Sequence, residues 1–328
     1  MRYKNVVVTR RGGPEVLEVV ENDLRDPSVG EARIRVLAAP VCLPDVQARY
    51  GQSPFPPKPP YVPGYAIIGN VEATGRDVHQ VAVGDRVAAL TIHGGYSEVI
   101  YLDQGKLIHA PTRLDPAEAV LLMLNYVLAY QLLHRTAKVK PGDKALIIGA
   151  SGGIGTAFLQ LGRLAGLRMY GIASRNKHNI LYEYGATPID YHTQDFVEVI
   201  HQMEPEGLDV IFDGMGGDYI DRAFSVLRRG GMLVEYANPL GYSGMFRLLG
   251  KVILFNLLPN GKKARLYGNS SVVNQRPFLE DWAVLFKLLE EGKIKPVIYQ
   301  KFPILEAAKA NALLESGQVI GNIVLVAS

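Results

Sequence analysis

The spacing of apolar positions along the chain changes near residue 112. Before that point the runs are short and alternate polar with apolar residues, or lie between glycines, as in "EARIRVLAA", "AIIGNVEATG", "GDRVAAL" and "GGYSEVIYL". A period of two, β-branched residues and flanking glycines are typical of β-strands. The first third of the chain is therefore predicted to be mostly β.

Longer elements follow. The segment "DPAEAVLLMLNYVLAYQLLH", residues 115–134, predicts a helix with Asp115 as N-cap and Pro116 in its first turn. Beyond it, expected strands alternate with expected helices: "KALIIGA", "RMYGIAS", "LDVIFDGMGG" and "MLVEYA" against "GTAFLQLGRLAG", "NKHNILYEYG" and "YIDRAFSVLRRGG". This alternation predicts a parallel sheet with helices on both faces.

The two patterns predict an α/β protein of two domains. We expect residues 1–121 to form a mostly β domain and residues 122–272 a doubly wound parallel sheet. We expect residues 273–328 to return to the first domain. One apolar segment, "MFRLLGKVILFNLLP" at 245–259, contains two cations and is too short to span a bilayer. We interpret it as a buried or interface helix, with a substrate lid or a membrane-surface contact as the alternative.

Composition narrows the class of protein. The 328 residues are 48% hydrophobic and 20% charged, as is ordinary for a globular chain. The 35 basic and 32 acidic residues are interspersed, which indicates neither a nucleic-acid nor a membrane partner. The start, "MRYKNVVVTRRGG", lacks the apolar core of a secretory signal, and a single cysteine excludes an internal disulfide. We expect a reducing, cytoplasmic location.

The most informative segment is "KALIIGASGGIGTAFLQLGR", in which a buried strand ends in a glycine-rich turn that opens a helix. Ala150, Gly152 and Gly155 occupy the three positions of the G-x-G-x-x-G dinucleotide fingerprint, with alanine in the first. Such a turn lets a phosphate approach the backbone N–H groups at the positive end of a helix. The segment therefore predicts a dinucleotide site.

The same residues also read G-x-S-x-G, from Gly149 through Ser151 to Gly153, which is the nucleophile elbow of hydrolases. A serine hydrolase of that kind needs an acid and then a histidine downstream. The last histidine is His201, within the next strand–helix units, and the remaining 127 residues contain none. The order of catalytic residues thus disfavours a hydrolase.

The second strand of a dinucleotide fold ends beside the adenosine ribose, where an acidic residue selects NAD. Here that strand is followed by Ser174, Arg175 and Lys177, without an acid. A hydroxyl and two cations suit a 2′-phosphate, so NADPH is the predicted cofactor; a solvated loop with two chance basic residues is the alternative. Tyr191, after the third strand, either flanks the adenosine phosphate or belongs to the core.

The chain resembles the quinone oxidoreductase/zeta-crystallin family of medium-chain dehydrogenases/reductases. The likeness rests on "GDKALIIGASGGIGTAFLQLGR" and on "VGDRV", "GGYSE", "FDGMGG", "GKIKP" and "GNIVL", which follow one another in the expected order. Within that family, "LNYVLAY" and "SRNKHNILYEYGATPIDYHTQDF" are similar to the branch that contains the vesicle amine transport protein.

The resemblance implies a GroES-like catalytic domain, built from both ends of the chain, and a Rossmann domain between them that binds NADPH. It implies a homodimer. The turn from Gly152 through Gly153 and Ile154 to Gly155 matches the family's pyrophosphate loop, and Lys177 and Tyr191 match positions near the 2′-phosphate. Asn322, in the "GNIVL" landmark, is included among the expected cofactor contacts.

In zinc-dependent relatives the position of Cys42 is a metal ligand three residues before an aspartate, here Asp45. However, Tyr65 and Ala66 stand where histidine and glutamate would follow, and no second cysteine exists. A catalytic zinc normally takes three protein ligands, so no metal is predicted. Cys42 is interpreted as lining the substrate pocket together with Tyr50 and Leu128; remote packing and a reactive thiol are the alternatives.

Without a metal, the acceptor must take hydride unaided, which favours a quinone or an α,β-unsaturated carbonyl. Tyr65 is the candidate proton donor, and a packed ring is the competing interpretation. An enoyl-thioester reductase is a second possibility, although Ser53 stands where those enzymes have a tyrosine. A protein that binds NADPH for a structural, sensing or partner-binding role, with little turnover, is the alternative outside catalysis.

Overall fold

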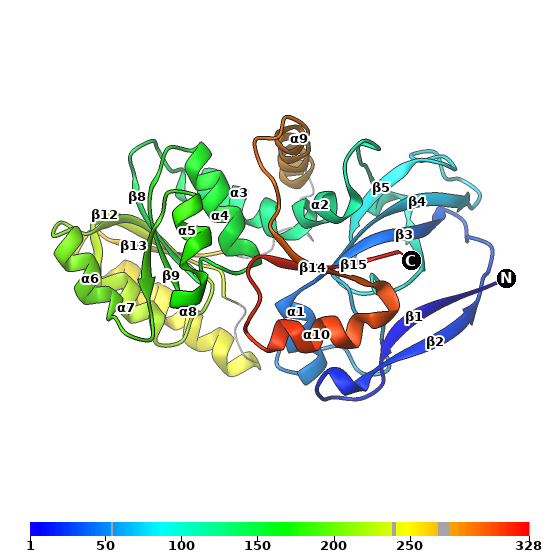
Figure 1. The fold of residues 1–328 in the computed structure, drawn as a ribbon, viewed down its shortest axis with the longest axis horizontal. Coiled ribbons are helices and arrows are strands. Elements are labelled where there is room, and N and C mark those ends of the chain that lie inside the picture. The colour runs from blue at the N-terminus through cyan, green and yellow to red at the C-terminus, as the bar shows by residue number, and fades with distance from the viewer. Residues whose placement is uncertain (54, 238–240, 268–275, 328) are drawn as a thin grey trace. The chain divides into compact units, whose positions relative to one another are not determined.

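The computed structural model describes residues 1–327 except 54, 238–240 and 268–275. It divides into two compact units (Figure 1): unit 1 comprises Met1–Leu124 and Trp282–Ser328, and unit 2 comprises Asn125–Asp281. The boundary expected after residue 272 lies outside the described residues.

Unit 1 contains a hairpin, β1–β2, and a seven-stranded sheet in the order β14-β15-β3-β4-β5-β7, with β6 also paired to β3. Among the strands that the structure describes in this sheet, only β14 and β15 run parallel to each other. The elements are β1 (Arg2–Val8), η1 (Pro14–Val16), β2 (Leu17–Asp23), β3 (Glu31–Val41), α1 (Leu43–Tyr50), β4 (Ala66–Thr74), β5 (Arg86–Leu90), β6 (Val99–Asp103), η2 (Gln104–Lys106), β7 (Ile108–His109), α2 (Pro116–Leu121), β14 (Ile298–Pro303), η7 (Ile304–Glu306), α10 (Ala307–Glu315) and β15 (Asn322–Val326).

The alternation seen in "EARIRVLAA" sets the core of unit 1. Along β3, Ala32, Ile34 and Val36 are fully buried, whereas the arginines between them are partly exposed. Strands from the two ends of the chain share this sheet, since β15 pairs antiparallel with β3, with Ile323 opposite Val41. The expected β structure of the first third of the chain is therefore confirmed.

Unit 2 is a parallel sheet of six strands in the order β10-β9-β8-β11-β12-β13, with helices on its faces (Figure 1). Its elements are α3 (Val127–Gln131), η4 (Leu132–Ala137), β8 (Lys144–Ile148), α4 (Gly153–Leu164), β9 (Arg168–Ala173), η5 (Arg175–Lys177), α5 (His178–Glu183), β10 (Thr187–Asp190), α6 (Phe196–Met203), β11 (Leu208–Asp213), α7 (Tyr219–Ser225), β12 (Leu227–Glu235), α8 (Gly241–Leu257) and β13 (Lys263–Leu266).

The strand order of unit 2 reverses between β8 and β11. The chain moves outward from β8 through β9 to β10, and then resumes at β11 on the other side of β8. In open α/β sheets, ligands bind beyond the carboxyl ends of the strands at such a switch point. The expected doubly wound sheet is confirmed, and its switch point lies where the glycine-rich turn follows β8.

The helix predicted at 115–134 is present, and Asp115 caps it by accepting the N–H of Ala117 at 2.8 Å. It continues through π-helical turns, η3 (Leu122–Tyr126) and η4, to Ala137, and the division between the units falls within it. Among the described residues, this is the one helix that is long and apolar enough to cross a bilayer, but 67% of its most apolar stretch is buried inside the protein. A core helix has the same properties, so this is weak evidence for a span. A second helix, α9 (Arg276–Glu290), also runs across a division between the units.

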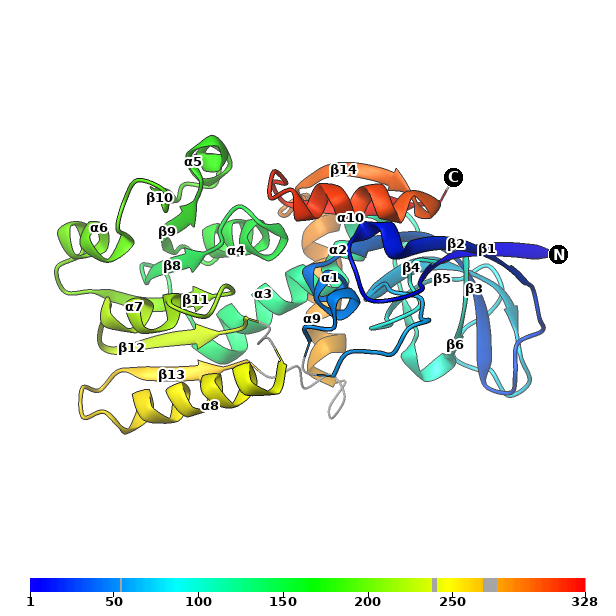
Figure 2. The same ribbon diagram turned by 90° about the horizontal axis from the view of Figure 1, so that it is seen from below.

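Two expectations about unit 2 need correction. The expected helix "YIDRAFSVLRRGG" includes residues 226–231, but α7 ends at Ser225 and β12 begins at Leu227. The reason is that Leu227 is buried and pairs with Leu208 of β11. The second is the buried or interface helix expected at 245–259. This segment lies mostly in α8, which runs beside the edge strand β13 (Figure 2). Of its side chains only Leu248 and Phe255 are buried, whereas Phe246 is 67% and Leu257 75% exposed. A buried helix is therefore wrong for most of this segment, whereas the interface helix, the substrate lid and the membrane-surface contact stay predictions.

Candidate functional site

The glycine-rich turn joins the end of β8 to the start of α4. Gly149 adopts a left-handed φ of +82°, which reverses the chain after the buried strand. Gly152 is the N-cap residue of α4, and it provides no side chain to cap the helix. The first N–H groups of a helix have no intrahelical carbonyl partner and carry the positive end of its dipole. The turn therefore presents uncapped donors to an anion.

Two glycines of the fingerprint have different physical roles. A Cβ on Gly155 would lie 2.3 Å from the carbonyl oxygen of Gly149 and 2.5 Å from the backbone of Ala150, so no side chain fits there. A Cβ on Gly152 would meet no atom closer than 3.6 Å. Gly155 is thus required for the helix to pack on the strand, whereas Gly152 leaves space that the protein itself does not fill. That space is what a pyrophosphate needs, so the site fits a dinucleotide.

The alanine in the first fingerprint position is accommodated by a glycine on the neighbouring strand. Ala150 is fully buried, and its Cβ lies 2.8 Å from where a Cβ on Gly171 would stand. Ser151 is also buried, at 8% exposure. A nucleophile elbow exposes its serine, so this turn does not have the geometry of a hydrolase.

The basic residues follow β9 on a short 3₁₀ turn, η5. Ser174 precedes the turn, and its Oγ lies 2.7 Å from Oδ1 of Asn176. Arg175 is exposed and Lys177 is half-buried, and burial lowers the pKa of Lys177. Because β9 neighbours β8, these side chains emerge at the same edge of the sheet as the glycine turn.

Tyr191 follows β10, the next strand outward. Its side chain is 50% exposed and its ring packs on that of His192, with centroids 4.1 Å apart. A core position for Tyr191 is thereby excluded, and its place beside the adenosine phosphate stays a prediction. The candidate dinucleotide residues of unit 2 therefore follow three neighbouring strands at their carboxyl ends.

In unit 1, Cys42 directly follows β3 and is the N-cap residue of α1. Its side chain is buried, with 6% exposed. Its neighbour Asp45 is also buried, accepting the N–H of Gly64 at 2.9 Å and the hydroxyl of Tyr96 at 3.4 Å. Burial, and then the charge of Asp45, raise the pKa of the Cys42 thiol well above its usual range. Burial likewise raises the pKa of Asp45 to about 7.

The donor set around Cys42 does not fit a catalytic zinc. Such an ion takes three protein ligands, usually histidine, cysteine or carboxylate. In the part of the chain that the structure describes, no three of these side chains come together as a metal site. Near Cys42 the third group is Tyr65, whose phenol is protonated because burial, Asp45 and Cys42 raise its pKa to about 12.

Tyr65 belongs to an aromatic cluster that the sequence did not reveal. The rings of Tyr65 and Tyr61 both meet His93 edge-on, with centroids 6.5 and 5.5 Å apart. The hydroxyl oxygen of Tyr61 is buried, without a hydrogen-bond partner within the described chain, and burial raises its pKa to about 12. Two protonated phenols and an imidazole therefore lie together, although about thirty positions separate His93 from the two tyrosines in sequence and no motif joins them.

The other expected site residues have distinct surroundings. The Tyr50 hydroxyl donates to Glu315 at 2.8 Å, and Glu315 also pairs with buried Arg49. Asn322 is buried in unit 1, and its amide donates to the carbonyl of Val297 at 3.0 Å. Leu128 is partly buried in α3 of unit 2.

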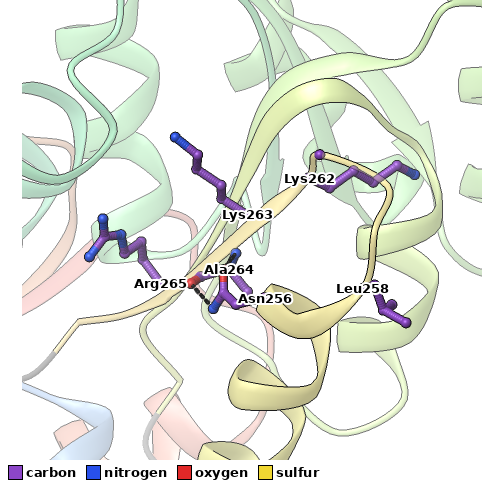
Figure 3. Close-up of a pocket in the computed structure, with 7 residues that line it drawn as sticks. Asn256, Leu258, Lys262, Lys263, Ala264 and Arg265 are labelled. Carbon is purple, nitrogen blue, oxygen red and sulfur yellow. Dashed lines mark hydrogen bonds between the residues drawn. The ribbon is translucent and has the colours of Figure 1, made fainter.

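A basic pocket of about 450 Å³ lies elsewhere on unit 2, between the end of α8 and β13. Its lining includes Lys262, Lys263 and Arg265, of which Lys263 and Arg265 point to the same side of β13 (Figure 3). Because Lys263 begins β13, this pocket is at the amino ends of the parallel strands. None of the expected site residues lines it.

Two family models match the chain. Residues 28–112 match the alcohol dehydrogenase GroES-like domain, and residues 184–325 match the zinc-binding dehydrogenase domain. The second match includes both the end of the parallel sheet and the C-terminal strands of unit 1.

Individual relatives span nearly the whole chain. The 2-haloacrylate reductase of Burkholderia sp is 32% identical over 98% of this chain and 98% of its own length. The synaptic vesicle membrane protein VAT-1 homolog of Rattus norvegicus is 31% identical over 92% of this chain and 78% of its length. The crystal structure of Escherichia coli quinone oxidoreductase complexed with NADPH has a TM-score of 0.89 and 26% identity, covering 98% of this chain and 99% of that one.

The single cysteine allows a direct test of its environment. We expect Cys42 in the native protein at pH 8 to react with iodoacetamide at least about tenfold more slowly than in urea, because the buried thiol stays protonated. Mass spectrometry measures the alkylated fraction over time. Equal rates in the native and unfolded protein would identify Cys42 as a reactive thiol instead.

Proposed function

Since the chain belongs to the medium-chain dehydrogenase/reductase superfamily, with the quinone oxidoreductases and VAT-1 homologues among its relatives, we propose that it is an NADPH-dependent reductase. Its acceptors are quinones or α,β-unsaturated carbonyl compounds, and it uses no zinc. The homodimer and the cytoplasmic location stay predictions from the sequence.

The observation that carries this proposal is the unfilled space at Gly152 in front of the uncapped N-terminus of α4. Backbone N–H groups of the turn would hold the pyrophosphate, and Arg175 and Lys177 would hold a 2′-phosphate. The Escherichia coli relative was crystallised with NADPH, which supports the same cofactor here.

When bound, NADPH supplies a hydride. The chain's own residues have to position the acceptor, exclude water and deliver a proton to the acceptor oxygen. Tyr65 suits the last task because its phenol remains protonated throughout the neutral range. The apolar, buried thiol of Cys42 beside it contributes shape and keeps water out.

The relatives support the acceptor class. One is named for reduction of a 2-haloacrylate, an α,β-unsaturated carboxylic acid, and another for reduction of quinones. Both kinds of acceptor take hydride at carbon or oxygen in conjugation with a carbonyl group. The donor set around Cys42, which does not fit zinc, is consistent with acceptors that need no Lewis acid.

A non-catalytic role is the second candidate, supported by the likeness to the VAT-1 homolog, which is named as a synaptic vesicle membrane protein. NADPH oxidation in the presence of 1,4-benzoquinones and simple enones separates the two candidates. Turnover supports the reductase. Tight NADPH binding without turnover on any of these acceptors, an enoyl-thioester included, supports the binding protein.

The two fingerprint glycines give a matched pair of variants. Gly152→Ala should leave the melting temperature unchanged but weaken NADPH binding at least about tenfold, because the new methyl group occupies the phosphate's space. Gly155→Ala should lower the melting temperature, because its Cβ collides with backbone atoms. Calorimetry measures both quantities. Unchanged NADPH affinity in Gly152→Ala would contradict the placement of the pyrophosphate.

Cofactor preference depends on the basic loop after β9. Replacing Arg175 and Lys177 by alanine should raise the KM for NADPH about 10- to 100-fold and leave that for NADH nearly unchanged, since only NADPH has the 2′-phosphate. Initial rates with each cofactor measure this. Replacing exposed Arg163, outside this loop, is the control. Equal effects on both cofactors would refute the assignment.

The proton-donor role is tested by Tyr65→Phe. We expect kcat with an enone to fall about 100-fold while the Kd for NADPH is unchanged, because only the hydroxyl is removed. Tyr299→Phe, at an exposed ring in the same unit, is the control. A wild-type kcat would assign the proton to solvent, and stoichiometric zinc in the purified protein would contradict the zinc-free mechanism.

A further inference from the structure

Two acidic side chains are completely buried side by side in unit 2. Asp213 ends β11 and Glu235 ends β12, and the two residues are direct partners in the parallel register. The two carboxyl groups lie close enough for each to shift the pKa of the other. The titratable groups that interact with the pair in the described chain are two tyrosines, Tyr219 and Tyr236. A tyrosine adds no positive charge, so two carboxylates in this contact would repel each other.

The hydrogen bonds of the pair account for two of its four oxygens. Oδ1 of Asp213 accepts the N–H groups of Met215 and Gly216 at 2.8 and 3.0 Å, and Oε1 of Glu235 accepts that of Ala237 at 3.2 Å. Oδ2 of Asp213 and Oε2 of Glu235 are buried, and no N–H or O–H group within the described residues donates to them. One proton between these two oxygens satisfies both of them.

We propose that Asp213 and Glu235 share one proton, and that this carboxyl–carboxylate hydrogen bond positions the loops after β11 (residues 214–216) and β12 (residues 236–237) beside the dinucleotide site. The second half of this inference rests on the proposed function. Neither side chain reaches a ligand, because both are fully buried. They are therefore positioning residues, which act through the loops whose N–H groups they bind.

The contacts of the loops show how the effect reaches the glycine turn. A Cβ on Gly214 would lie 2.6 Å from the ring of Tyr236, so the two loops are in direct contact next to the pair. Met215 then extends to the turn, where its sulfur lies 3.8 Å from the position of a Cβ on Gly149. Phe158 of α4 stacks on Phe212, beside Asp213, with ring centroids 4.5 Å apart. Movement of the β11 loop would therefore disturb both the turn and the helix that follows it.

The shared proton has a defined pH range. Burial, and then the charge of Asp213, raise the pKa of Glu235 to about 9, and burial raises that of Asp213. At neutral pH the pair therefore keeps its proton. The unfolded chain releases it near pH 4, so the folded state loses stability as pH rises from about 4 to about 9. Above that range the second charge appears and the loops are pushed apart.

Glu235→Gln is the matched test, because the amide N–H replaces the shared proton and leaves one negative charge on Asp213. We expect the difference spectrum of wild type minus Glu235→Gln at pH 8 to show the infrared C=O band of a protonated, buried carboxyl group. Buried Asp45, whose pKa is about 7, is mostly ionised at that pH and is the same in both proteins. Exposed Glu206, near the same sheet, provides the control Glu206→Gln, which should keep the band.

NADPH affinity then tests the positioning role. The Kd of the wild-type protein should rise about tenfold per pH unit above the pKa of the pair, whereas that of Glu235→Gln should not show this rise. Glu235→Leu, which keeps the bulk but loses the hydrogen bonds, should weaken NADPH binding about fivefold at pH 7, and Glu235→Gln should restore it. A catalytic role would not produce this pattern in a binding measurement.

The outcomes separate this inference from the proposed function. If neither the wild-type protein nor any variant binds NADPH, the proposed function fails. The infrared band and the pH dependence of the stability of the free protein still test the shared proton in that case. If NADPH binds but the band is absent, or if Glu235→Gln shows the wild-type pH dependence, the shared proton is wrong. Equal affinities of Glu235→Leu and wild type would overturn the positioning role.

Discussion

The candidate site depends on one backbone contact, between the first turn of α4 and the end of β8. At Gly155 the helix lies so close to the carbonyl of Gly149 that even a methyl group would overlap it. This approach fixes the direction in which the first N–H groups of α4 point, and it places them beyond the carboxyl end of a central strand. The rest of the dinucleotide site is arranged around that fixed direction, since β9 and β10 deliver their loops to the same edge.

Local patterns predicted most of this arrangement. The strand–turn–helix at β8, the basic loop at Arg175 and the N-cap at Asp115 each depend on neighbouring residues, and all are present. What the sequence did not reveal depends on contacts between distant segments. Tyr61 and His93 meet only through the folding of unit 1. Leu227–Gly230 has the composition of a helix end, but pairing with β11 makes it a strand, because tertiary contacts outweigh local propensity. Asp213 and Glu235 likewise become partners only through strand register.

The surroundings of Cys42 show how a fold can keep a motif and change its chemistry. The cysteine three residues before Asp45 remains in place at the start of α1, and the family models include zinc-binding dehydrogenases. Its neighbour Tyr65 offers a neutral phenol where a metal site would need a ligand that binds strongly. A thiol held protonated by burial packs as a small apolar group. The proposed acceptors, quinones and enones, match these surroundings because conjugation already polarises them and they need no Lewis acid.

The two sides of the switch point are held by different kinds of interaction. On the β8 side, the close approach at Gly155 involves uncharged backbone, so its geometry does not change with pH. On the β11 and β12 side, two buried carboxyl groups bind the loop N–H groups, and that geometry depends on a proton. Hydrophobic side chains at these two positions would not hold the loops, because the N–H groups of Met215 and Gly216 would lose their acceptor. Each loop has one carboxyl group as the acceptor of its N–H groups. Two carboxylates in contact would repel each other, so the pair needs a shared proton. The buried acid pair therefore couples the order of these loops to pH in a way that the glycine turn alone would not.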